Sequence, residues 1–171
     1  MDYAKLDRYA NREAFLEDLQ ERIYAAEMQH HGCSQVIVQT FLDVFEEENQ
    51  LVSMASSPFA AGMAFTGNTC GALIGGIMVL GMAFGRRSLE QGMDGILTGA
   101  RPVRKLVRHF SEQPGRLNCR DITGTDLADP AKAQAYFDGG GLEKCAAMMV
   151  DVGCFAGNLL YDEKERLEKQ I

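Results

Sequence analysis

Five cysteines are the residues of this sequence best suited to chemistry, because a thiolate is both a nucleophile and a ligand for soft metals. Three of them fall at or near the start of an expected helix, namely Cys33, Cys70 and Cys145. Helix N-termini carry partial positive charge and unpaired N–H groups, so we expect them to favour thiolate over thiol. We expect Cys119 in a loop beside Arg120, whose charge acts in the same direction.

The remaining cysteine, Cys154, is expected to be a core residue outside any shared site. It follows Cys145 by nine positions, so on one helix the two side chains point in nearly opposite directions. Buried cysteine often serves only as a small hydrophobic residue, and no CxxC pair gives a local metal-binding spacing. The absence of CxxCH excludes covalent attachment of a c-type haem. No role is assigned to the three histidines, His30, His31 and His109.

The segment that positions Cys70 is apolar and rich in glycine. We expect a central helix from Cys70 to Phe84, capped by Thr69 and ended by Gly85. Gly71 and Gly75 are four residues apart and therefore form a flat strip that a neighbouring helix can approach closely. Each mid-helix glycine costs about 1 kcal/mol relative to alanine, which calls for a packing or functional reason. The neighbour could come from the same chain or from a second copy in a homodimer.

The rest of the sequence also has helical patterning. Phe15, Leu19 and Ile23 are spaced by four, as on one face of an amphipathic helix. The other helices are expected over residues 11–30, 33–48, 58–65, 88–99, 102–113, 130–137 and 142 to the C-terminus, with a loop over 116–129. There is no alternating strand pattern. The sequence therefore predicts one all-α domain over residues 1–171, with about six or seven helices around the central one.

Composition narrows the functional classes. The net charge of −7 argues against nucleic acid as a partner, and 46% hydrophobic residues are ordinary for a globular protein. The N-terminus shows no apolar signal segment, so we expect a cytoplasmic protein in which cysteines are metal-binding, redox or buried thiols. Only residues 70–84 are continuously apolar, which is short of the roughly 20 residues of a membrane span. The basic side of residues 101–108 is expected to be a solvated helix face.

Four cysteines in their contexts resemble the redox-active protein family named for its signature C…GCAxxG…C…C. The matching segments are His31-Gly32-Cys33-Ser34-Gln35, Cys70-Gly71-Ala72-Leu73-Ile74-Gly75, Cys119-Arg120-Asp121 and Leu142-Glu143-Lys144-Cys145-Ala146. The resemblance covers roughly residues 30–155. It departs from the signature at Thr69, where the family has glycine before its second cysteine.

This resemblance implies a redox or iron–sulfur protein. A similar module occurs in split-Soret cytochromes, helical dimers that carry c-type haem beside a cysteine-bound iron centre. Because this sequence lacks the haem-attachment motif, only the cysteine site carries over. The resemblance places that site at Cys33, Cys70, Cys119 and Cys145.

Three hypotheses follow, and none assigns a catalytic residue. The first is a cytoplasmic electron-transfer protein that ligates an iron–sulfur cluster through these four cysteines, with an unidentified redox partner protein; zinc is an alternative metal. The second is a thiol/disulfide redox protein or oxidoreductase that uses the same cysteines. The third is a helical binding or scaffold protein with inert thiols.

Overall fold

The computed structural model of the chain describes residues 1–112 and 117–170. These residues form eight α-helices joined by short turns, and they contain no β-strand. The α-helices are α1 (Arg12–His30), α2 (Cys33–Val44), α3 (Gln50–Ser56), α4 (Gly71–Phe84), α5 (Gly92–Glu112), α6 (Cys119–Thr123), α7 (Pro130–Tyr136) and α8 (Leu142–Glu168). The predicted all-α class is confirmed.

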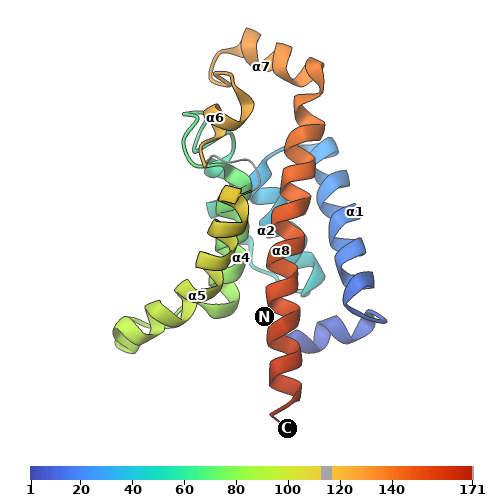
Figure 1. Cartoon of the computed structure of the whole chain (residues 1–171), viewed down its shortest axis with the longest axis vertical. Helices are drawn as coiled ribbons and strands as arrows, with labels where there is room; N and C mark the ends of the chain where they lie inside the picture. Colours follow the sequence, from blue (N-terminus) through green and yellow to red (C-terminus); the bar gives the residue numbers. More distant parts are fainter. Residues whose placement is uncertain (113–116, 171) are drawn as a thin grey trace.

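The expected central helix is α4, which packs against α2, α5 and α8. Its ends lie close to the predicted ones, with Cys70 as the N-cap residue and Gly85 as the C-cap residue. The long helix α8 lies beside α1, and α6 and α7 lie at one end of the molecule (Figure 1). This arrangement positions the cysteines, because α2, α4, α6 and α8 each hold one at or near the N-terminus.

The packing of α1 on α8 follows the predicted apolar face. Phe15, Leu19 and Ile23 are fully buried. On α8, Gly157 leaves room for this face, since a Cβ there would lie 2.6 Å from Leu19 Cδ1. At its N-terminus α1 is capped by Asn11, whose side chain accepts a hydrogen bond from the Ala14 N–H at 2.9 Å. The close helix contact fixes α1 along the length of the core.

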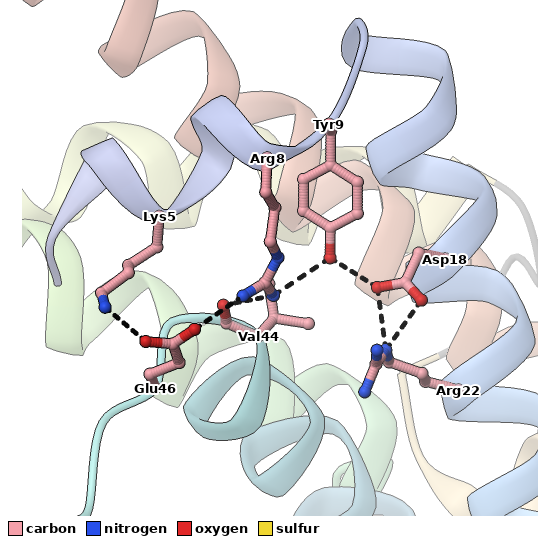
Figure 2. A network of polar contacts seen from close by, with 7 residues as sticks. All are labelled: Lys5, Arg8, Tyr9, Asp18, Arg22, Val44 and Glu46. Atoms are coloured by element: carbon pink, nitrogen blue, oxygen red, sulfur yellow. Dashed lines mark hydrogen bonds and ion pairs between the residues drawn. The ribbon is translucent and has the colours of Figure 1, made fainter.

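A polar network connects the N-terminal 3-10 helix η1 (Tyr3–Arg8) and the following Tyr9 to α1 and to the end of α2 (Figure 2). Tyr9 Oη donates to Asp18 Oδ2 at 2.5 Å, and Arg22 Nε donates to the same carboxylate at 2.8 Å. Arg8 donates to the carbonyl oxygen of Val44 at 2.6 Å. These bonds connect the N-terminus to α1 and to the end of α2.

Three sequence predictions about the elements are wrong. Residues 58–65 do not form one right-handed helix. The 3-10 helix η2 (Ser57–Phe59) ends at Phe59, and a left-handed turn follows it. Residues 92–112 form one helix instead of two; Pro102 lies inside it, and the buried Leu106 and Phe110 continue its apolar face. The expected loop around Cys119 contains the short helix α6. The expected helix end at Pro114-Gly115 lies outside the described residues.

Among the described helices, none is by itself both long and apolar enough to cross a membrane. Only α4 taken together with the following segment Leu89–Glu112 passes that test, and the two are bent by 85° at their junction.

Candidate cysteine site

One cavity of about 440 Å³ brings together all four cysteines of the signature. Cys33 is the first residue of α2, Cys70 is the N-cap residue of α4, and Cys119 is the first residue of α6. Cys145 lies in the first turn of α8. The four segments are far apart in sequence, and the fold of a single chain places their thiols around one space.

The glycine strip of α4 allows α2 to come close. A Cβ at position 71 would lie 2.3 Å from Cys33 Sγ and 2.6 Å from the carbonyl oxygen of Phe59. One turn further, a Cβ at position 75 would lie 2.8 Å from the carbonyl oxygen of Ser34. The neighbour that the strip accommodates therefore belongs to the same chain, and the expected role of these glycines is confirmed.

A short backbone pairing places Cys119 beside Cys70. The Cys70 N–H donates to the carbonyl oxygen of Leu117 at 2.9 Å, and the Cys119 N–H donates to that of Asn68 at 2.7 Å. Thr69 and Asn118 form an antiparallel bridge between these bonds. This pairing is too short to leave an alternating sequence pattern, so it was not predicted.

A left-handed turn forms part of the cavity wall. Residues 61–65 all have φ between 52° and 73°, although only Gly62 among them is a glycine. An L-residue in this conformation costs about 1–2 kcal/mol, so the surroundings must hold the turn in place. Ala61 and Phe65 line the cavity, and the Ala61 N–H acts on the Cys33 thiol to lower its pKa. The turn thus closes the cavity and acts on one of its thiols.

Tyr136 is a site residue that the sequence patterns did not indicate. Its hydroxyl lies 3.6 Å from Cys145 Sγ, within hydrogen-bonding distance for sulfur. The π-helical turn Phe137–Gly141 reverses the chain between them, with Gly140 at φ 81°. A Cβ at Gly141 would lie 2.3 Å from Tyr136 Cε1, so only glycine lets the ring lie there. The three consecutive glycines predict only a helix break, and nothing in them identifies Tyr136.

Burial keeps the free thiols protonated. It raises the pKa values of Cys33, Cys70 and Cys119 to about 12 and also raises that of Cys145. The backbone N–H groups of Ala72 and Leu73 at the start of α4 lower the pKa of Cys70, but by less than burial raises it. The expectation that helix N-termini favour thiolate is therefore wrong for the metal-free protein, because desolvation outweighs the helix ends.

Glu27 is a second site residue that was not predicted, and it lines the same cavity. Glu27 is 5% exposed, and its Oε2 atom has no hydrogen-bond partner. Burial raises the pKa of this carboxyl to about 7. A signal was present in the sequence, since Glu27 continues the four-residue spacing of Phe15, Leu19 and Ile23 on the buried face of α1.

The fifth cysteine and one of the three histidines lie on different sides of the cavity boundary. Cys154 lies outside the cavity, where its Sγ contacts the carbonyl oxygen of Leu16 on α1 at 3.7 Å. His31 lines the cavity, and its Nδ1 lies 2.9 Å from the carbonyl oxygen of Glu27. The histidine is thus held at the end of α1 by a backbone contact.

Four thiols share the cavity, but the described side chains form no close set of donors for a single metal ion. Across residues 1–112 and 117–170, no three side chains of His, Cys, Asp or Glu come close enough together to hold one ion. The cavity nevertheless offers four thiols and one buried carboxyl around a shared space, and backbone N–H groups act to lower the pKa values of two of the thiols. Thiols around a larger space, with N–H groups donating to sulfur, are the donor set of an iron–sulfur cluster.

Comparison with known proteins gives one match. A family model described as "Putative redox-active protein (C_GCAxxG_C_C)" matches residues 31–159, a segment that contains all four cavity cysteines. No curated protein and no solved structure matches the chain.

Proposed function

This chain belongs to the redox-active C…GCAxxG…C…C family, and we propose that it holds an iron–sulfur cluster through its four cavity cysteines and carries single electrons. The observation that carries the proposal is the convergence of Cys33, Cys70, Cys119 and Cys145 on one cavity within one chain. Cysteine thiolates are the usual protein ligands of such clusters, and hydrogen bonds to their sulfurs tune the reduction potential.

The high pKa values of the thiols are compatible with this role. A coordinating metal deprotonates a thiol outright, because the metal charge replaces the proton. The bound cluster would supply a site that accepts and releases one electron. Around it, the N–H groups of Ala61, Ala72 and Leu73, which act to lower the pKa of the free thiols, would donate to cysteine sulfur.

The cellular setting is part of the same proposal. A chain whose five cysteines are all unpaired suits a reducing, cytoplasmic compartment. Electrons would be exchanged with a partner redox protein, and a homodimer remains part of the proposal. The net charge of −7 favours partners with a basic docking surface.

Anaerobic reconstitution with iron and sulfide tests the proposed cluster. The wild-type protein should become brown, with visible absorbance, and should contain iron and acid-labile sulfide. Changing any one of the four cavity cysteines to serine should reduce the iron content several-fold. Cys154→Ser is the matched control, because this cysteine lies outside the cavity, and it should load like the wild type.

Two results would overturn the proposal. One is a wild-type protein that stays colourless and takes up neither iron nor sulfide. The other is a purified protein whose elemental analysis shows zinc and whose zinc is not displaced during reconstitution.

A thiol/disulfide cycle through the same cysteines is the alternative. Rapid exchange depends on thiolate, and the raised thiol pKa values oppose it at neutral pH. Counting thiols before and after mild oxidation, with mass mapping of any bridge, distinguishes this alternative from the cluster.

A further inference from the structure

Glu27 brings a buried carboxyl into the cavity from α1, a wall helix that provides no cysteine there. Glu27 Oε2 has no solvent contact and no hydrogen-bond partner. A buried polar atom without a partner costs about 1–3 kcal/mol, and more if it is charged. Such a group calls for a ligand that the protein itself does not provide.

No ion pair among the described residues fills this role, although His31 lines the same cavity, where its Nδ1 contacts the backbone carbonyl oxygen of Glu27. Within the described part of the chain, no Lys, Arg or His side chain forms an ion pair with it. Burial is the cause of its raised pKa, with no opposing positive charge. The titratable groups that share the cavity with Glu27 include the neutral thiols of Cys33 and Cys145, which would repel a carboxylate if they were ionised.

A bound metal ion would remove both problems, the unpaired carboxyl oxygen and the lack of a compensating positive charge. It would give the orphan oxygen a partner and would offset the negative charge of carboxylate and thiolates together. Glu27 is already positioned for this, since it lines the same cavity as the four thiols.

We propose that Glu27 is a fifth ligand of the metal centre, binding an iron ion through its carboxylate alongside the cysteine thiolates. On binding, the O–H bond of the acid breaks, an oxygen–iron bond forms and the proton leaves to solvent. The inference rests on the proposed cluster. It makes the centre a mixed sulfur–oxygen site instead of an all-cysteine one.

The test compares Glu27→Gln with Glu21→Gln in full-length protein. Glutamine keeps the size of the side chain but removes its charge, and it should fold at least as well because it leaves no buried acid. Glu21 lies on the exposed side of the same helix, which makes it the matched control. Circular dichroism of both metal-free variants establishes that the helices are intact.

The readouts are iron and sulfide content, the visible spectrum and the electron paramagnetic resonance signal after anaerobic reconstitution. We expect Glu21→Gln to match the wild type. We expect Glu27→Gln to bind iron about 10-fold or more weakly and to give an altered resonance signal, as loss of a metal-site partner does elsewhere. X-ray absorption at the iron edge of the wild-type protein should show an oxygen shell in addition to sulfur.

The outcomes separate this inference from the proposed function. If wild-type protein binds iron through sulfur alone, and Glu27→Gln gives the same content and spectra, the Glu27 ligand is wrong and the cluster stands. If wild-type protein binds no iron, both proposals are overturned.

Discussion

At the scale of single residues, the cavity combines groups that all resist ionisation when no metal is bound. Burial raises the pKa values of its thiols, of Tyr136 and of Glu27. Each of the negative charges that these groups could form also disfavours the others, since Cys119 and Cys145 are among the groups that raise the pKa of Cys70. Metal-free protein should therefore hold the thiols and the Tyr136 hydroxyl in their neutral forms, and the Glu27 carboxyl in its neutral form below about pH 7.

Glu27 makes the stability of the metal-free protein depend on pH. Its pKa rises from 4.5 to about 7 on folding, so the native state keeps its proton where the unfolded chain loses it. The contribution of Glu27 to the free energy of unfolding should therefore be largest below pH 4.5 and should be lost as the pH rises to about 7. Chemical denaturation of reduced, metal-free protein at a series of pH values measures this fall.

The same series in Glu27→Gln should lack this component, because glutamine does not titrate. Glu21→Gln should retain it. A Glu27→Gln profile parallel to that of the wild type would show that the carboxyl is not buried as described.

At the scale of elements, the position of α4 depends on the absence of a side chain at one of its glycines. A Cβ at Gly71 would meet Cys33 and Phe59, whereas Gly81 on the same helix is exposed, and a Cβ there would have no neighbouring atom within 4 Å. The two glycines therefore have different roles, one in close packing and the other without a steric requirement. Substitution by alanine separates them.

Gly71→Ala should destabilise the protein by about 1–3 kcal/mol, because the new methyl group overlaps Cys33 Sγ and a backbone carbonyl. Gly81→Ala should be neutral or should stabilise by up to about 1 kcal/mol through helix propensity. Urea denaturation measures both. Equal effects of the two substitutions would contradict the close approach of α2 to α4.

The left-handed turn at residues 61–65 is a second element with a testable strain. Ala64 is exposed and has φ 52°, so Ala64→Gly should stabilise the protein by a few tenths to about 1 kcal/mol, as relief of strain exceeds the added flexibility of the unfolded chain. Ala60 has an ordinary φ of −57°, and Ala60→Gly should destabilise instead. Destabilisation by both substitutions, measured by urea denaturation, would contradict the left-handed turn.

At the scale of the whole molecule, the cavity is lined by segments from several parts of the chain, and not all of them belong to the hydrophobic core. α1, α2, α4 and α8 share the hydrophobic core, and the cavity adds α6 and the turn at residues 61–65. A metal centre bound by all of these segments would bind the folded state and not the unfolded chain. It would therefore stabilise the whole fold by mass action.

Removal of the metal should lower the stability of the reconstituted protein. At a free metal concentration about 100 times Kd, the gain on binding is about 2.7 kcal/mol, and chelation should reverse it. Thermal unfolding with and without chelator measures the change. The variant with all four cavity cysteines changed to serine is the control, and its melting temperature should not respond to chelator.

The sequence by itself determined the helical class, the central helix and the four cysteines, because these depend on local periodicity, on glycine spacing and on a family signature. The limits of α1 and α4 were predicted within a residue for the same reason. Glu27 falls on the apolar face of α1 in the sequence pattern, but the pattern alone did not identify it as a site residue. Its role depends on burial and on the neighbouring cysteines, which only the folded structure shows.

Only the tertiary structure decided what surrounds the cysteines. The pairing of Asn68 with Cys119, the left-handed turn and the contact of Tyr136 with Cys145 all join residues through non-local packing, which no local preference specifies. Burial, a property of the whole fold, also reversed the expected effect of the helix ends on the thiols. Within this fold, four cysteines from distant segments meet at one cavity because the glycines of α4 and the reversals around it let their backbones approach.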